Sequence, residues 1–151
     1  MKTATETHHI PFFVYGTLKT GFYNYERFLR GRTINEQDAW LSGAALYSNG
    51  RLPFMVLNGN LAEAHDLVSG HLMTIEPALY PATLGTLDLL EGYVPGSFAN
   101  YYHRVRVLVQ VGAHSTMAWT YLAGPRILAQ IRSGALRKVP NGEWLAEAVV
   151  S

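Results

Sequence analysis

The feature that most constrains the fold is a pair of neighbouring strand patterns between residues 101 and 124. From 105 to 111, valine occupies every second position, which is the period of a strand with one buried face. Gly112 and Ala113 follow, and the apolar segment 115–124 comes directly after them. Because antiparallel strands can be joined by so short a turn and parallel ones cannot, these segments predict a β-hairpin.

Further segments have the apolar or alternating character of strands, or the spacing of helices. We expect strands at 11–18, 39–50, 52–59 and 67–75. We expect helices at 24–31, with Asn24 as N-cap, from about 80 to the stop at Gly92, and at 125–134. Strands dominate and follow one another in hairpins, so the sequence predicts an α+β fold rather than a doubly wound parallel sheet.

The composition indicates a folded globular chain and excludes several classes of partner. The 151 residues fit a single domain, 1–151, in which residues 1–9 form a flexible polar tail. A net charge of +1 gives no reason to expect a nucleic acid or an anionic membrane as partner, and no apolar run is long enough to span a bilayer. The absence of cysteine excludes disulfides, thiolate metal sites and a cysteine nucleophile. We expect a cytoplasmic protein, either a monomer or a homodimer.

The turn after the first strand is the first candidate for chemistry. Tyr15 ends the strand, and Gly16, Thr17 and Leu18 follow it in the segment GTLKTG. Consecutive main-chain N–H groups in such a turn can hold a carboxylate or stabilise an oxyanion. The same residues also fit an ordinary connection between a strand and a helix, and their spacing is not that of a P-loop.

Glu91 is the second candidate, because it closes an apolar helix directly before a glycine. Neighbouring leucines disfavour its charge, and the C-terminus of a helix is itself partly negative, so both effects raise the pKa of the carboxyl. A carboxyl that titrates near neutral pH can act as a general acid and base. The alternative is a solvated glutamate on the last helical turn, and Asp88 is a rival carboxylate three residues earlier.

The segment YYHRV at 101–105 is the third candidate. Alternation places Tyr102 and Arg104 on one face of the strand, with Tyr101 and His103 on the other. A tyrosine and an arginine that share a face can bind a carboxylate and a polar group, although they also fit a sheet face covered by long side chains. No HExxH or GxSxG pattern occurs, so we expect no metal site and no serine nucleophile.

Together these segments resemble the gamma-glutamylcyclotransferase-like superfamily, which includes the AIG2-like proteins. The resemblance rests on VYGTLKTG at 14–21, LPFMV at 52–56, VSGHLMTI at 68–75, LDLLEGY at 87–93, YYHRVRV at 101–107, AWTYLAG at 118–124 and VPNGEW at 139–144. It implies a mixed, mainly antiparallel barrel-like sheet with flanking helices. It also implies a pocket in which the YGTL turn faces the glutamate at the end of the helix.

The resemblance also implies roles for single residues. It makes Glu91 the catalytic acid and base. It assigns substrate binding to the loop Tyr15, Gly16, Thr17 and Leu18, to Tyr102 and Arg104 on the matching strand, and to Tyr121 on the next strand. The implied substrate is a small γ-glutamyl amide, whose own α-amino group attacks the γ-carbonyl to give 5-oxoproline and a free amine or amino acid. Such an enzyme needs no cofactor, because it only has to fold the substrate and move protons.

Three alternatives stay open at this stage. The leaving group is undetermined, so the enzyme is alternatively a γ-glutamylamine cyclotransferase, or a biosynthetic enzyme that removes a γ-glutamyl protecting group. The second alternative is a non-catalytic protein that binds a ligand in the same pocket. The third is a purely structural module, which predicts a solvated Glu91 and no cavity beside Gly16.

Overall fold

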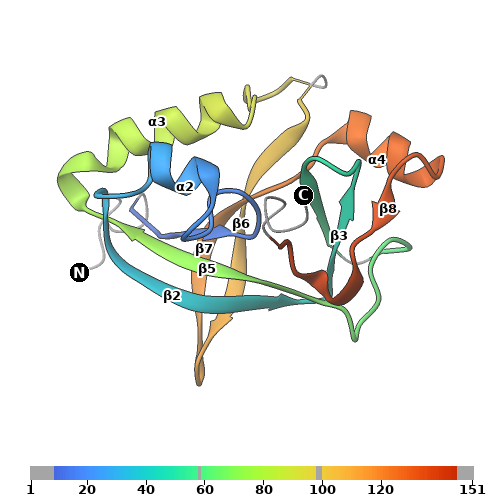
Figure 1. The fold of residues 1–151 in the computed structure, drawn as a ribbon, viewed down its shortest axis with the longest axis horizontal. Helices are drawn as coiled ribbons and strands as arrows, with labels where there is room; N and C mark the ends of the chain where they lie inside the picture. Colours follow the sequence, from blue (N-terminus) through green and yellow to red (C-terminus); the bar gives the residue numbers. More distant parts are fainter. Residues whose placement is uncertain (1–8, 58, 98–99, 146–151) are drawn as a thin grey trace.

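Helices pack against one side of a strongly curved sheet in this computed structural model, which describes residues 9–57, 59–97 and 100–145 (Figure 1). The strands are β1 (Phe12–Val14), β2 (Thr33–Ser42), β3 (Ala44–Ser48), β4 (Pro53–Leu57), β5 (Leu67–Ile75), β6 (Tyr102–Val111), β7 (His114–Ala123) and β8 (Arg137–Lys138). The helices are α2 (Tyr23–Phe28), α3 (Tyr80–Leu90) and α4 (Pro125–Arg132), with 3₁₀ turns at Pro77–Leu79 and Pro140–Gly142.

The sheet closes into a barrel through β1. The strands pair in the order β1–β5–β2–β6–β7, and β7 also pairs in parallel with β1, where Phe12 lies opposite Trp119. β4, β3 and β8 extend the sheet from β7. Most of these pairs are antiparallel, while β1–β7 and β4–β7 are parallel. The fold is therefore α+β, with a mixed, mainly antiparallel barrel-like sheet and flanking helices, as predicted.

Strand β1 is buried on both of its faces, which explains its unbroken apolar sequence. Phe13 packs in a hydrophobic cluster that fills the barrel. Nearly all members of this cluster, including Val109, come from strands. Phe12 and Val14 point the other way, into a cluster that includes Tyr80 of α3 and residues of α2 and α4. One core thus lies inside the barrel, and a second lies between the barrel and its helices.

The β6–β7 hairpin is confirmed. Val111 lies opposite His114, so Gly112 and Ala113 form the turn between the strands. The valines at 107, 109 and 111 are buried, whereas Leu108 and Gln110 between them are exposed. This alternation keeps one face of β6 in the barrel interior.

Two predicted strands have the wrong bounds. β1 ends at Val14 rather than at 18, because the chain bends into a turn after Tyr15. The predicted strand 39–50 is divided at Gly43, whose φ of 73° lies in a region that glycine adopts readily. The first half of β2, before residue 39, is polar and mostly exposed, so its sequence carries no apolar signal although it pairs with β5.

The prediction of Asn24 as a helix N-cap is wrong. Helix α2 begins at Tyr23, and its N-cap residue Phe22 makes no capping hydrogen bond through its side chain. Instead, the main-chain carbonyl of Thr17 accepts hydrogen bonds of 3.1 Å from the amides of both Asn24 and Tyr25. The turn after β1 therefore supplies the hydrogen-bond acceptor for the first amides of α2, and these bonds connect the turn to the helix.

The predicted helices near 80–91 and 125–134 are present as α3 and α4. Of the predicted flexible tail, residues 1–8 lie outside the described residues, and His9 stacks on Tyr80 with ring centroids 4.5 Å apart. None of the helices in the described ranges has the length and apolar character that a bilayer crossing requires.

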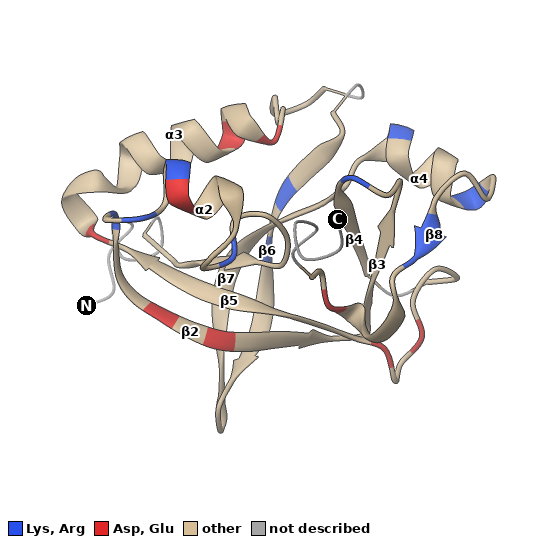
Figure 2. Cartoon of the chain, viewed as in Figure 1, with Lys and Arg blue, Asp and Glu red and all other residues tan. Residues whose placement is uncertain are grey.

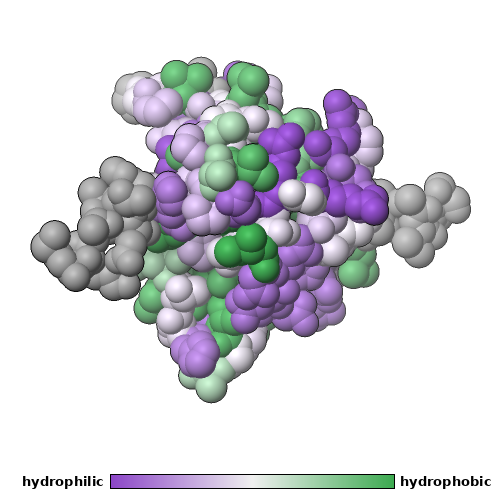
Figure 3. All heavy atoms as spheres, turned by 90° about the vertical axis from the view of Figure 1, so that its left-hand side faces the viewer, coloured by the Kyte–Doolittle hydropathy of each residue, from purple (hydrophilic) through white to green (hydrophobic). Residues whose placement is uncertain are grey.

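Charged residues are spread over the fold rather than gathered on one element. Figure 2 shows acidic positions on β2 and α3 and basic positions on α4 and β8. On the face drawn in Figure 3, hydrophilic groups cover much of the right-hand half, and hydrophobic groups lie in separate small areas.

Candidate active site

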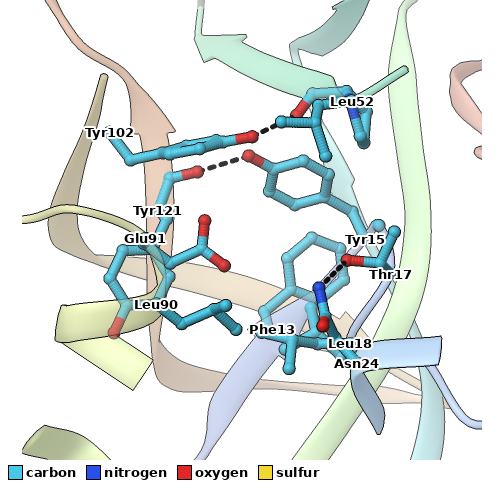
Figure 4. Close-up of a pocket in the computed structure, with 13 residues that line it drawn as sticks. Phe13, Tyr15, Thr17, Leu18, Asn24, Leu52, Leu90, Glu91, Tyr102 and Tyr121 are labelled. Carbon is cyan, nitrogen blue, oxygen red and sulfur yellow. Dashed lines mark hydrogen bonds between the residues drawn. The ribbon is translucent and has the colours of Figure 1, made fainter. Parts of the chain in front are cut away.

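A cavity of about 170 Å³ lies where the turn after β1 meets the C-terminal end of α3. Its wall is completed by residues of β6 and β7 and by the start of β4 (Figure 4). The residues that line it are Phe13, Val14, Tyr15, Gly16, Thr17, Leu18, Asn24, Leu52, Pro53, Leu90, Glu91, Tyr102 and Tyr121. The structure thus brings the YGTL turn and Glu91 to one hollow, from positions more than seventy residues apart in the sequence.

Three turn residues that line this cavity have unpaired main-chain donors. Among the described residues, the amides of Gly16, Thr17 and Leu18 donate no hydrogen bond to another protein group. Two of their carbonyls are used, since that of Gly16 accepts from the amide of Lys19 at 3.1 Å and that of Thr17 accepts from α2. Free N–H groups in a cavity wall can bind an anion or a polarised carbonyl.

Gly16 is required by close packing and not by an unusual backbone conformation. Its φ is not positive, but a Cβ added there would lie 2.8 Å from Cγ of Pro53, nearer than such contacts allow. Pro53 is held in turn, because its carbonyl accepts a hydrogen bond of 2.9 Å from the hydroxyl of Tyr102. The glycine therefore lets the turn lie directly against the start of β4.

Glu91 is the C-cap residue of α3, and the helix ends there in a Schellman motif. The amide of Tyr93 donates to the carbonyl of Asp88 at 2.9 Å, the amide of Gly92 donates to that of Leu89 at 3.1 Å, and Gly92 has a φ of 68°. This motif fixes the direction in which the side chain at position 91 leaves the helix. Figure 4 shows its carboxylate pointing into the cavity, toward Tyr15 and Phe13.

The surroundings of Glu91 favour the protonated carboxyl. Burial raises its pKa to about 7, the direction that the flanking leucines indicate from the sequence. No hydrogen bond joins its carboxyl to another described residue, so none stabilises the charged form. A carboxyl in this state can both accept and donate a proton near neutral pH.

Three tyrosines surround the carboxyl, and all three hydroxyls donate elsewhere. Tyr15 donates to the carbonyl of Tyr121 at 2.6 Å, Tyr102 donates to the carbonyl of Pro53, and Tyr121 donates to Asp88 at 2.7 Å. Burial raises the pKa of all three phenols, so they stay neutral in the physiological range. They shape the cavity, and Glu91 is the one acidic side chain, with no basic one, among the described residues that line it.

Arg104 is the one predicted site residue that does not line the cavity. Its Nε donates to Oδ1 of Asp88 at 2.8 Å, and its guanidinium lies over the ring of Trp119. A contact between Arg104 and substrate stays a prediction. Asp88, which the sequence offers as a rival to Glu91, is the partner of both Arg104 and Tyr121.

The sequence does not identify every residue of the cavity wall. Asn24, taken as a helix cap, lines the cavity instead and donates from its side chain to Oγ1 of Thr17 at 2.7 Å. Leu52 and Leu90 form apolar parts of the wall, and no spacing pattern distinguishes them from core residues. Within the described residues, no three histidine or acidic side chains lie together as a metal site would require.

A comparison with known protein families shows the family to which the chain belongs. The sequence description of gamma-glutamyl cyclotransferases of the AIG2-like type matches residues 12–146. The chain belongs to this family. The AIG2-like assignment covers every residue that lines the cavity, and it agrees with the resemblance found in the sequence motifs. No curated protein matches the chain.

Solved structures share the fold of this AIG2-like chain. YkqA from Bacillus subtilis superimposes with a TM-score of 0.61 at 22% identity, over 89% of this chain; the chain spans only 39% of YkqA. An uncharacterized protein from Pyrococcus horikoshii has a TM-score of 0.55 at 16% identity, over 89% of this chain and 88% of its own. A solution structure from Arabidopsis thaliana has a TM-score of 0.54 at 22% identity, over 83% of each chain. At these identities the likeness shows the fold alone.

Proposed function

We propose that this AIG2-like protein converts a γ-glutamyl amide into 5-oxoproline and a free amine. The observation that carries the proposal is the pairing, across one small cavity, of a proton-exchanging carboxyl and a turn with free amides. In the reaction the α-amino nitrogen of the substrate forms a bond to its own γ-carbonyl carbon. The bond from that carbon to the leaving nitrogen then breaks.

Glu91 moves the protons of this reaction. It accepts a proton from the α-ammonium group, which frees the nitrogen lone pair for attack, and it delivers a proton to the leaving nitrogen. Its pKa of about 7 suits both steps, because a general acid–base catalyst works best when its pKa is near the operating pH. The absence of a hydrogen-bonded partner among the described residues leaves both carboxyl oxygens available to substrate.

The turn after Tyr15 holds the substrate in its cyclising shape. The free amides of Gly16, Thr17 and Leu18 bind the α-carboxylate or the γ-carbonyl oxygen, whose negative charge grows as the ring closes. Tyr102 and Tyr121 form the wall against which the glutamyl chain folds. Holding the two reacting atoms close together supplies a large part of the rate enhancement in an intramolecular reaction of this kind.

The charge of the cavity favours an amine rather than an amino acid as leaving group. Among the described lining residues there is no lysine, arginine or histidine, and the one carboxyl is that of Glu91. An amino acid would bring a carboxylate next to the bond that breaks, without a cation to pair with it. An alkylamine brings no such charge, so a γ-glutamylamine is the preferred substrate class.

A paired set of substrates tests the proposal. The γ-glutamyl amides of butylamine and of norvaline have leaving groups of similar size, and they differ in one carboxylate. We expect 5-oxoproline from the butylamide, with a kcat/KM at least tenfold above that of the norvaline compound. Failure to release 5-oxoproline from any γ-glutamyl amide would overturn the proposed reaction, and a preference for the norvaline compound would overturn the leaving group.

A further inference from the structure

The C-terminal end of α3 is attached to the barrel by one carboxylate oxygen. Oδ1 of Asp88 accepts a hydrogen bond of 2.8 Å from Nε of Arg104 on β6 and one of 2.7 Å from the hydroxyl of Tyr121 on β7. The pair is largely shielded from water, with side-chain exposures of 20% for Asp88 and 15% for Arg104. An ion pair in this setting is screened less by salt than one on the surface.

Arg104 also contacts the residue that completes the end of the helix. Its guanidinium lies 4.2 Å from the ring centroid of Trp119 and 5.4 Å from that of Tyr93. Tyr93 is the last member of the Schellman motif and donates its amide to the carbonyl of Asp88. Arg104 therefore contacts the helix end at two points, the Asp88 carboxylate and the Tyr93 ring.

Glu91 lies between these two points in the sequence, and its carboxyl has no hydrogen-bonded partner among the described residues. Its position depends on the residues before and after it. Because Asp88 and Tyr93 are both held against β6 and β7, the last turn of α3 cannot rotate or lift without breaking these contacts. The distance from the Glu91 carboxyl to the free amides across the cavity is set in this way.

We propose that Asp88, Arg104 and Tyr121 form a clamp whose role is to position Glu91 for proton transfer. The clamp rests on the proposed function. Arg104 then acts through Asp88 and the helix end, and not through contact with substrate. This differs from a pair that only adds stability, because a displacement of about 1 Å in a reacting group can cost about 10²-fold in rate.

Kinetics of single and double variants test the clamp. We expect Asp88→Asn and Arg104→Gln each to lower kcat by about 10–100-fold, with KM within about threefold of wild type. The double variant should be no more than about threefold slower than the worse single variant, because both changes break one unit. A kcat within threefold of wild type in either single variant, a rise in KM without a fall in kcat, or losses that multiply would each overturn the proposal.

Glu26→Gln is the matched control. Glu26 of α2 also pairs with an arginine, Arg30, at 2.7 Å, but that pair is exposed and does not line the cavity. We expect the kcat and KM of Glu26→Gln to equal those of wild type. If Asp88→Asn does not fold, Tyr121→Phe takes its place, since it keeps the ring in the cavity wall and removes only the hydroxyl bond to Asp88.

Hydrogen exchange tests the clamp without any turnover. In Asp88→Asn, or in Tyr121→Phe, we expect the amides of Gly92 and Tyr93 to exchange at least about tenfold faster than in wild type, while amides of the β6–β7 hairpin are unchanged. Unchanged exchange at both amides would overturn the clamp. If wild type releases no 5-oxoproline, the proposed reaction fails, and this exchange result alone decides whether the clamp exists.

Discussion

The hydroxyl of Tyr15 donates a hydrogen bond of 2.6 Å to the main-chain carbonyl of Tyr121, and both residues line the cavity. The same hydroxyl accepts a bond of 3.3 Å from the amide of Met55 on β4. One buried oxygen therefore joins the turn after β1 to β7 and β4. This contact holds two walls of the candidate active site at a fixed separation.

Removing that oxygen should cost stability. Tyr15→Phe leaves the carbonyl of Tyr121 and the amide of Met55 without their partner, and a buried unsatisfied polar group costs about 1–3 kcal/mol. We expect a loss of that size in the free energy of unfolding, measured with urea, together with a lower kcat.

Tyr47→Phe is the control for this change. The hydroxyl of Tyr47 also donates to a carbonyl, that of Leu61, but it is only partly buried and lies outside the cavity wall. The Tyr47→Phe variant should have the same kcat as wild type. Equal stability of Tyr15→Phe and wild type would contradict the proposed role of the hydrogen bonds made by the Tyr15 hydroxyl.

A methyl group at position 16 should displace the substrate turn. In Gly16→Ala the new Cβ meets Cγ of Pro53 at 2.8 Å, so the turn must move away from β4. We expect a loss of about 1–3 kcal/mol in the free energy of unfolding and a fall in kcat/KM of about 10²-fold, because the free amides move with the turn.

Gly85→Ala is the matched control for this change. Gly85 lies within α3, and nothing is within 4 Å of the position where its Cβ would be added. The substitution should raise the free energy of unfolding by about 0.5–1 kcal/mol, since glycine is the poorer helix former, and leave turnover unchanged. Equal kcat/KM for Gly16→Ala and wild type would show that the turn does not hold substrate.

The hairpin and the later helices could be predicted from the sequence pattern, and the family resemblance implied the pairing of Glu91 with the YGTL turn. The hairpin has a strict period of two, and Gly92 marks the end of α3 directly after Glu91. The polar half of β2 could not be predicted, because its pairing with β5 leaves most of its side chains in water. The ion pair of Arg104 with Asp88 could not be predicted either, since alternation indicates the face of a strand but not which helix carboxylate lies opposite it.

The raised pKa of Glu91 should appear in the pH dependence of stability. Folded protein binds a proton at Glu91 up to about pH 7, whereas the unfolded chain releases it near 4.5. A folded pKa above the unfolded one means that this contribution to stability is complete below pH 4.5 and is lost as the pH rises through 7. Glu91→Gln has no such loss, so its stability relative to wild type should rise by up to about 3 kcal/mol between pH 4.5 and 8. Parallel stability curves, from urea unfolding across this range, would mean that the carboxyl is solvated.

The measurement that tests the central claim most directly is 5-oxoproline release by wild type and Glu91→Gln from one γ-glutamyl amide. Glutamine keeps the size of the side chain and removes only its ability to exchange a proton. We expect wild type to release 5-oxoproline, and the variant to fold normally with an unchanged dissociation constant for the substrate and a kcat lower by about 10²–10⁴-fold. Equal kcat values for the two proteins would contradict the assignment of Glu91 as the proton-transferring group.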